Sequence, residues 1–299
     1  MQRVAADGSE ANEARTRRER VAVLGAGTMG HGIAQVAALA GCEVVLRDID
    51  DASLQKGLSG IRRSLDKAVE KGKASAEDAK AALGRIRTTT ELASAVEKAD
   101  LVVEAVPEKL DLKRTVFQDV HRSAPRDAVL ATNTSSIPIR SIAEALPEGD
   151  RARVVGMHFF NPVPVMKLVE VVHGPETSPE TVKRVADLAQ RMGKETIVVR
   201  DAPGFATSRL GIAIGLEAIR MLEEEVASAE DIDKAMTLGY AHPMGPLRLT
   251  DLVGLDVRLH IAEGLAKSLG PRFEPPALLR KLVAEGRLGQ KSGHGFYRW

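Results

Sequence analysis

The chain has 299 residues, enough for one large domain or two ordinary ones. Its 44% hydrophobic and 28% charged residues are typical of a soluble globular protein, and 42 lysines and arginines nearly balance 41 aspartates and glutamates. This balance gives no overall basic field and argues against a nucleic acid partner, although a local patch for a phosphorylated ligand stays open.

The first residues of the chain predict neither a leader nor a membrane anchor. Residues 1–19 are small, polar and charged and contain no apolar h-region, so we expect a disordered tail. The apolar stretch 21–42 is rich in glycine and includes His31 and Gln35, which makes it too polar to span a membrane. Cys42, the single cysteine, excludes an intrachain disulfide. We therefore expect a cytoplasmic protein without a membrane partner.

The chain after the tail begins with a strand, a helix and a second strand. An apolar run over 20–24 is followed by a glycine loop, then by a helix over 33–39 that Gly41 closes. A second apolar run over 43–48 predicts the next strand. Two strands joined by a helix within about thirty residues form a βαβ unit, which implies parallel pairing and a right-handed crossover.

Strands and helices continue to alternate up to residue 200. We predict strands over 86–90, 100–106, 128–132, 153–158, 166–172 and 196–200. We also predict one or two long helices over 52–82 and single helices over 141–145 and 179–192. This alternation is typical of an α/β fold, here an N-terminal Rossmann-type doubly wound sheet over 20–200.

The pattern changes at Asp201, and residues 201–299 are expected to form an all-helical C-terminal domain. On a predicted helix over 205–225, Glu217, Arg220 and Glu224 form one narrow polar stripe. A helix that is apolar elsewhere should be buried on most sides. We expect this domain to carry part of the substrate site and a subunit interface.

The glycine loop has the spacing G-x-G-x-x-G. Directly after a strand, its first glycine allows a tight turn, its second lets the backbone approach a pyrophosphate, and its third lets the helix pack closely. The helix N-terminus then presents N–H groups and a positive dipole end to the phosphates. The predicted cofactor-binding residues of this loop are Gly25, Gly27, Thr28, Met29 and Gly30.

Asp48 ends the second strand eighteen residues after Gly30, where its carboxylate can accept hydrogen bonds from the adenosine ribose. The same carboxylate would repel a 2′-phosphate, so NAD is favoured over NADP, while Arg47 beside it leaves NADP open. We find no G-x-x-x-x-G-K-[ST] loop after a strand and no histidine–carboxylate spacing typical of a metal site, so no metal is expected.

A histidine and a glutamate point to alcohol oxidation. His158 ends a strand, and Glu170 lies in the apolar strand 166–172, where an unpaired carboxylate would be costly. A neighbouring imidazole would be a good partner. In such a pair the neutral histidine takes the hydroxyl proton as hydride leaves, and the carboxylate fixes the tautomer and stabilises the imidazolium.

These residues belong to a longer recognisable segment, His158-Phe-Phe-Asn-Pro-Val-Pro-Val-Met-Lys-Leu-Val-Glu170. It resembles the catalytic segment of the L-3-hydroxyacyl-CoA dehydrogenases, including bacterial 3-hydroxybutyryl-CoA dehydrogenases. The resemblance runs from about Arg20 to the end of the chain. It includes the glycine loop, Val103-Glu-Ala-Val106, Thr132-Asn-Thr-Ser-Ser136, Asp201-Ala-Pro-Gly-Phe205, Gly245-Pro246 with Asp251, and Gly293-His-Gly-Phe-Tyr297.

The resemblance implies a reaction, a substrate class and an assembly. The expected reaction is NAD-dependent oxidation of an L-3-hydroxyacyl-CoA, with a short chain such as 3-hydroxybutyryl-CoA, to the 3-ketoacyl-CoA. The expected assembly is a homodimer through the helical domain. By match to the family, His158 is the base, Glu170 its partner, and Ser135 bonds the substrate oxygen. Further implied contacts are Glu108, Lys113 and Asn133 to the cofactor, and Ser64, Lys71 and Asn161 to the acyl-CoA. For Lys71 a solvated lysine on a helix is an equal alternative.

One position departs from the family. After Asp201-Ala-Pro-Gly-Phe205 the family has an asparagine that is expected to meet the substrate oxygen, and Ser208 stands there in this chain. Serine is shorter and has one donor where the amide has two. We predict reduced or redirected activity.

Two other readings stay open. One is a dehydrogenase of the same superfamily for a hydroxy acid without CoA, although such relatives alter the Phe-Phe that is intact here as Phe159 and Phe160. The other is a catalytically silent NAD-binding protein. The serine at position 208 favours this hypothesis, whereas the presence of Ser135, His158 and Glu170 argues against it.

Overall fold

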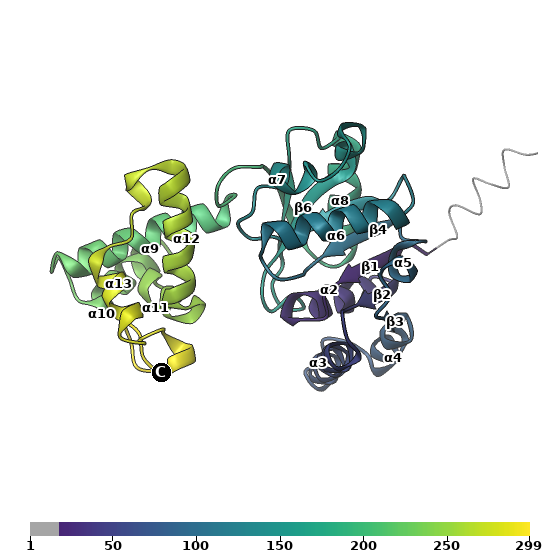
Figure 1. Cartoon of the computed structure of the whole chain (residues 1–299). Coiled ribbons are helices and arrows are strands. Elements are labelled where there is room, and N and C mark those ends of the chain that lie inside the picture. The colour runs from purple at the N-terminus through teal and green to yellow at the C-terminus, as the bar shows by residue number, and fades with distance from the viewer. Residues whose placement is uncertain (1–17) are drawn as a thin grey trace, which may run out of the picture. The chain divides into compact units, whose positions relative to one another are not determined.

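The computed structural model describes residues 18–299, so that all of the predicted tail but residues 18 and 19 lies outside the described part. The chain divides into two compact units, of which the first ends at Asp201 and the second runs from Ala202 to Trp299. Figure 1 shows the first as a sheet with helices and the second as helices and loops.

One eight-stranded sheet forms the centre of the first unit, in the order β3-β2-β1-β4-β5-β6-β7-β8. Strands β1 to β6 pair in parallel, β7 is antiparallel to β6, and β8 is parallel to β7. The strand bounds are β1 Arg20–Leu24, β2 Glu43–Arg47, β3 Ile86–Thr89, β4 Leu101–Glu104, β5 Val129–Thr132, β6 Val154–Phe159, β7 Leu168–His173 and β8 Glu195–Arg200.

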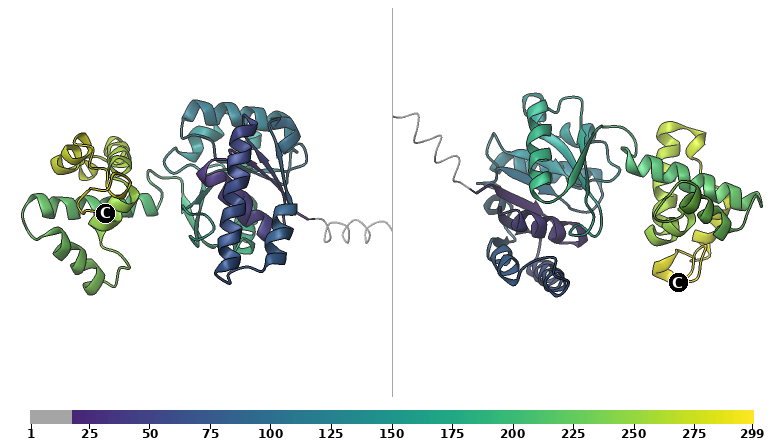
Figure 2. Two further views of the ribbon diagram at one scale, coloured as in Figure 1. Left: turned by 90° about the horizontal axis from the view of Figure 1, so that it is seen from below. Right: turned by 180° about the vertical axis from the view of Figure 1, so that it is seen from behind.

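Helices cover both faces of this sheet, as Figures 1 and 2 show. One core joins side chains of α2, α3, α4 and α8 to one face of the strands, while α5, α6 and α7 belong to the other face. The helix bounds are α2 Thr28–Leu39, α3 Asp51–Glu70, α4 Ala76–Gly84, α5 Leu92–Val96, α6 Leu110–Ser123, α7 Ile139–Ala143 and α8 Pro179–Arg191, with a 3₁₀ turn η1 at Glu148–Arg153. The doubly wound α/β fold is thereby confirmed.

The structure differs from the sequence prediction at several elements. Helix α2 begins at Thr28, not at residue 33, because the glycine loop runs straight into it. Helices α5 and α6 were not predicted, although Val116, Phe117 and Val120 of α6 are buried at helical spacing. Antiparallel β7 was not predicted either; the short link from β6 leaves no room for the crossover that a parallel strand needs.

The second unit consists of helices and loops, as predicted, apart from isolated bridges of His294 with Gly289 and Arg298. A core of aliphatic side chains with Phe273 joins its helices. In the single chain helix α9 buries one side, and Leu210 on it is 63% exposed. The burial on most sides, expected together with a subunit interface, stays a prediction. The bounds are α9 Thr207–Glu223, α10 Ala229–Gly239, α11 Pro246–Val253, α12 Leu255–Leu269 and α13 Ala277–Ala284, with 3₁₀ turns η2 Pro271–Phe273 and η3 Gln290–Ser292.

Candidate active site

The glycine loop joins the carboxyl end of β1 to α2, and its three glycines meet different constraints. Gly25 has a φ of +103°, and a Cβ on it would lie 2.6 Å from the Ala105 carbonyl oxygen. A Cβ on Gly30 would lie 1.7 Å from the Gly25 carbonyl oxygen, so the third glycine allows the helix to pack on the loop itself. Around Gly27 a Cβ would meet nothing within 4 Å among the described residues. The loop therefore has open space at its second glycine.

The start of α2 is suited to an anion. Within Thr28–Leu39 the first turn has no acidic residue, and the N-cap residue Gly27 supplies no side-chain bond to it. The backbone N–H groups of this turn thus have no side-chain cap, and Gly27 and Thr28 are exposed. A helix N-terminus with these properties fits the pyrophosphate of a dinucleotide.

Asp48 follows β2 and bonds to the glycine loop. Its Oδ2 accepts a hydrogen bond from the Ala26 N–H at 2.6 Å, and its Oδ1 accepts one from the Ile49 N–H at 2.7 Å. The neighbouring Arg47 donates from Nε to the Thr90 carbonyl oxygen at 3.1 Å. Asp48 therefore fixes the loop, a function that the sequence analysis did not assign to it.

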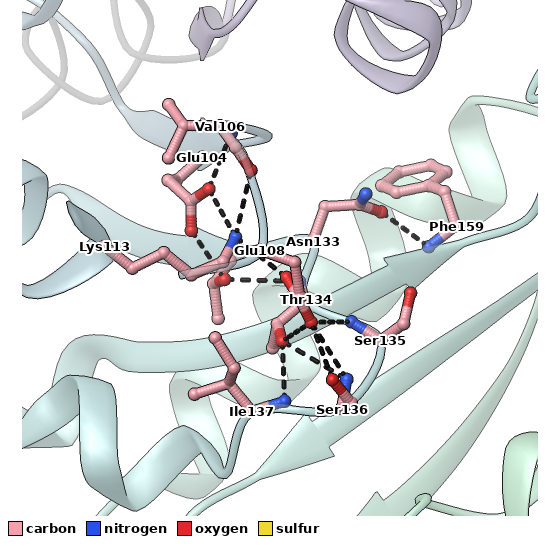
Figure 3. A network of polar contacts seen from close by, with 11 residues as sticks. Glu104, Val106, Glu108, Lys113, Asn133, Thr134, Ser135, Ser136, Ile137 and Phe159 are labelled. Carbon is pink, nitrogen blue, oxygen red and sulfur yellow. Dashed lines mark hydrogen bonds and ion pairs between the residues drawn. The ribbon is translucent and has the colours of Figure 1, made fainter. Parts of the chain in front are cut away.

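A buried polar network lies at the carboxyl ends of β4 and β5 (Figure 3). Lys113 Nζ is 2.6 Å from Glu104 Oε1, and both side chains are 1% exposed. Glu104 also accepts from Thr132 Oγ1 at 2.7 Å and from the Val106 N–H at 2.7 Å. The ammonium of Lys113 is 3.3 Å from Glu108 Oε2 as well. The Lys113 ammonium thus forms ion pairs with two carboxylates. The contact of Lys113 with the cofactor stays a prediction.

Glu108 holds the loop that carries Ser135. Its Oε1 accepts from Thr134 Oγ1 at 2.5 Å, from the Ser135 N–H at 3.0 Å and from the Ser136 N–H at 3.1 Å, as the dashed lines of Figure 3 show. Burial alone would raise the pKa of the Glu108 carboxyl, but the Lys113 ammonium and these donors outweigh burial and lower it. The Ser135 side chain itself is exposed.

Asn133 ties this loop to the strand that carries the histidine. Its Oδ1 accepts a hydrogen bond from the Phe159 N–H at 2.9 Å, while its own N–H donates to the Glu104 carbonyl oxygen at 2.8 Å. The Asn133 side chain is nearly buried. It therefore links the ends of β4, β5 and β6.

His158 and Glu170 lie opposite each other in the antiparallel pair β6–β7. The distance between His158 Nδ1 and Glu170 Oε2 is 2.6 Å, with the histidine 7% and the glutamate 0% exposed. The Phe160 ring lies 4.6 Å from the imidazole, centroid to centroid. The pairing expected from the sequence is present. When Nδ1 donates to the carboxylate, the neutral imidazole carries its lone pair on Nε2.

The remaining predicted site residues are spread over the chain. Ser64 is partly exposed on α3, and Lys71 is exposed at the end of that helix. Asn161 is exposed and precedes Pro162 through a cis peptide bond. Ser208 is partly exposed in the first turn of α9, in the second unit. The first unit by itself thus brings together Ser135 and Glu108, and Asn133 joins their loop to the strand that carries His158.

Sequence reasoning missed Lys194, which holds the link after Asn161. Its Nζ donates to the carbonyl oxygens of Val163 at 2.5 Å and Met166 at 2.9 Å, and the residue is 6% exposed. Burial lowers the pKa of this ammonium. A lysine after a helix and a glycine carries no signal of this role in the sequence.

The described residues contain neither a grouping suited to a metal ion nor a helix suited to a membrane. Across residues 18–299 no three histidine, cysteine, aspartate or glutamate side chains are grouped so that they could hold a metal ion. Over the same residues no helix is long and apolar enough to cross a membrane.

Comparison with known proteins adds the family. Residues 20–202 match the NAD binding domain of 3-hydroxyacyl-CoA dehydrogenase, and residues 204–299 match its C-terminal domain. The chain belongs to the 3-hydroxyacyl-CoA dehydrogenase family. The expected resemblance, the oxidoreductase class and NAD as cofactor are thereby confirmed.

Three relatives show how far the similarity extends. A probable 3-hydroxybutyryl-CoA dehydrogenase of Deinococcus radiodurans is 46% identical over 93% of this chain and 99% of its own. The mitochondrial hydroxyacyl-coenzyme A dehydrogenase of Sus scrofa is 44% identical over 94% of this chain and 91% of its own. The crystal structure of (S)-3-hydroxybutyryl-CoA dehydrogenase from Ralstonia eutropha is 41% identical, covers 95% of this chain and 99% of its own, and superposes with a TM-score of 0.90.

Proposed function

We propose that this protein oxidises short-chain L-3-hydroxyacyl-CoA, such as 3-hydroxybutyryl-CoA, to 3-ketoacyl-CoA, with His158 as general base and Glu170 as its positioning partner. The observation that carries the proposal is the 2.6 Å contact between Nδ1 and Oε2 within the sheet. A base held by a buried carboxylate is suited to removing a hydroxyl proton. The names of the Deinococcus and Ralstonia relatives support the four-carbon substrate.

The proton follows a definite course in this proposal. The substrate O–H bond breaks, its proton moves to Nε2 of His158, and the carbon–oxygen bond becomes a carbonyl as the C3 hydrogen leaves with its electron pair. NAD, when bound, accepts that hydride. The Glu170 carboxylate holds the imidazole by Nδ1 and stabilises the positive charge that the proton creates.

The cofactor would be held by the loop Gly25–Gly30 and by Asp48. The open space at Gly27 and the side-chain-free first turn of α2 are suited to the pyrophosphate, and the Asp48 carboxylate to the adenosine ribose. We infer that Lys113 and Asn133 act on the cofactor through the segments they hold, because the Lys113 ammonium bonds to Glu104 and the Asn133 Oδ1 accepts from the Phe159 N–H.

Substrate contacts are assigned by the family resemblance and by exposure. Ser135 is exposed on a loop fixed by Glu108 and is proposed to donate to the substrate oxygen. Ser64, Lys71 and Asn161 are proposed to contact the acyl-CoA. Ser208 is proposed to replace the family's asparagine near the substrate oxygen.

Steady-state kinetics test the assignment. Acetoacetyl-CoA should oxidise NADH, and His158→Gln should lower kcat by about 10² to 10⁴. Exposed His260 on α12 provides the matched control, since His260→Gln makes the same change of side chain outside the β6–β7 pair. A kcat that His158→Gln leaves unchanged would overturn the assigned base. Turnover of free hydroxy acids alone would favour a CoA-independent dehydrogenase. NAD binding without turnover of any substrate would favour an NAD-binding protein without catalytic activity.

Assays with 3-ketoacyl-CoA substrates of increasing chain length test which acyl chain the enzyme prefers. We expect kcat/KM for 3-ketoacyl-CoA reduction to be highest at four carbons and to fall with longer chains. A maximum at ten or more carbons would contradict the short-chain proposal.

We further propose a homodimer formed through the second unit. Helices α9, α11 and α12 pack on one another and carry exposed apolar side chains. These include Leu210 at 63%, Ile214 at 39%, Leu252 at 44% and Val257 at 40% exposure. Exposed apolar residues gathered on adjacent helices are typical of a partner surface. Light scattering should give twice the mass of 32.1 kDa, and Leu210→Glu should give the single mass.

The cytoplasm stays the predicted compartment of this protein.

A further inference from the structure

A cavity of about 420 Å³ opens at the amino ends of β1, β2 and β3, the edge of the sheet opposite to the glycine loop. Its lining includes Arg20 and Ala22 from β1, Glu43 and Val45 from β2, and Arg87 from β3. The volume is within the range of small-molecule sites, about 300 to 1,000 Å³. Figure 1 labels the strands β1, β2 and β3 and the helix α5, whose residues line the cavity.

The strand register explains why these side chains meet. Ala22 pairs with Val45, and Val45 pairs with Arg87, so the three side chains stand in one row on the same face. Arg20 pairs with Glu43 one step further along that face. The face is the one covered by α5, since the core with α2 takes the intervening residues of β1 and β2. The small side chain at Ala22 leaves the floor of the cavity hollow and apolar.

The rim of the cavity is strongly basic. Arg18, Arg20, Arg85, Arg87 and Lys98 line it, with Glu43 as the one carboxylate of the lining. Outside the lining, Glu97 Oε1 lies 3.8 Å from Lys98 Nζ. The Glu43 carboxylate forms an ion pair with Arg20, whose Nε lies 3.5 Å from Glu43 Oε2. The Arg85 guanidinium donates a hydrogen bond to the Ala38 carbonyl oxygen. Within residues 18–299 the guanidinium groups of Arg18 and Arg87 have no hydrogen bond or ion pair. Like charges gathered around one cavity repel, and an anion would relieve that repulsion.

We propose that this cavity is a second ligand site, separate from the dinucleotide site, for a small organic phosphate. Guanidinium groups match phosphate oxygens in geometry and charge, and several cations favour a group with more than one negative charge over a monocarboxylate. Val45 and Ala22 on the floor, with Ala95 and Ala99 facing them, take the apolar or planar body of the ligand.

Binding to the full chain tests the proposal. NADH is first added at a concentration that fills one site per chain, and ADP, inorganic pyrophosphate and hexanoate are then titrated by calorimetry. ADP should bind most tightly, pyrophosphate less tightly and hexanoate weakest, and ADP binding should weaken with added salt. Backbone amide shifts on ADP addition should appear at Arg20, Glu43 and Arg87.

A double variant and a matched control complete the test. Arg87→Gln with Lys98→Gln should raise the Kd for ADP at least tenfold. Arg122→Gln with Lys183→Gln removes one arginine and one lysine that are 70% and 76% exposed outside the cavity, and should leave the Kd unchanged. Release of NADH as ADP binds, an unchanged Kd in the first variant, or absence of any second-site binding would each overturn the proposal.

Discussion

Lys113 Nζ lies 2.6 Å from Glu104 Oε1, and each of the two side chains is 1% exposed. The pair joins the end of β4 to helix α6 below the loop that carries Glu108. A buried pair of this kind is sensitive to the loss of one member, because the other is left as an uncompensated charge. Lys113 therefore matters for stability before it matters for any ligand.

Lys113→Met should lower the free energy of unfolding by about 3 to 5 kcal/mol, because the Glu104 carboxylate stays buried without its cation. The double variant Glu104→Gln, Lys113→Met should lose less than the sum of the two single losses. Urea unfolding followed by circular dichroism measures both. Lys109→Met, at an exposed lysine beside the same helix, is the control. A Lys113→Met protein as stable as the parent would show that the pair contributes nothing.

Asp48→Ala should change the cofactor preference. The variant loses the bond to the Ala26 N–H and the charge that opposes a 2′-phosphate. A hydrogen bond to a charged group contributes about 1.5 to 3 kcal/mol, so kcat/KM for NADH should fall by about 10- to 100-fold. The ratio of NADPH to NADH activity should rise. An unchanged ratio in parallel assays with the two cofactors would count against the role of Asp48.

Ser208→Asn should raise kcat/KM for acetoacetyl-CoA reduction, because the amide restores a longer side chain with two donors. We expect an increase of about tenfold, the equivalent of one hydrogen bond. Thr207→Asn places the same side chain one residue earlier and serves as the control. An unchanged kcat/KM in Ser208→Asn would contradict the proposed contact between Ser208 and the substrate.

Glu108 should make stability depend on pH. In the folded protein the pKa of the Glu108 carboxyl lies below its ordinary value of 4.5. At a pH between the folded and the ordinary pKa, the unfolded chain therefore binds more protons than the folded chain. The stabilisation is present above 4.5 and is lost as the pH falls through the folded value. Unfolding measured at about pH 6.5 and about pH 3.5 should show a smaller acid loss for Glu108→Gln than for the parent. Equal losses in the two proteins would contradict the lowered pKa.

Asp251 should be a stability determinant of the second unit. Its buried carboxylate accepts from the N–H groups of Phe296 and Tyr297 at 2.8 and 2.9 Å and from Trp299 Nε1 at 2.9 Å. Asp251→Asn sets an amide N–H₂ against these donors and should cost about 2 to 3 kcal/mol. Thermal unfolding checks this, with Asp66→Asn at an exposed site as the control. A variant that melts with the parent would disprove it.

Much of the fold could be predicted because its signals are local. Strand-length apolar runs and the glycine spacing predicted β1, α2 and β2, and an acidic residue within an apolar strand predicted that Glu170 needs a partner. The bonds of Asp48 to Ala26 and of Lys113 to Glu104 could not be predicted, since they depend on how separate elements pack. The reversal at β7 could have been inferred, because eight residues between Phe159 and Leu168 cannot make a crossover.

His158 and Glu170 are carried by one contiguous stretch, Val154–His173, and are twelve residues apart. Glu104 and Thr132, by contrast, meet across 28 residues and an intervening helix. The shorter span closes at a lower entropic cost, so base and partner come together as the β6–β7 hairpin forms. A genetic exchange with ends on either side of this hairpin would move both side chains at once and leave the glycine loop, and with it the choice of cofactor, to the recipient.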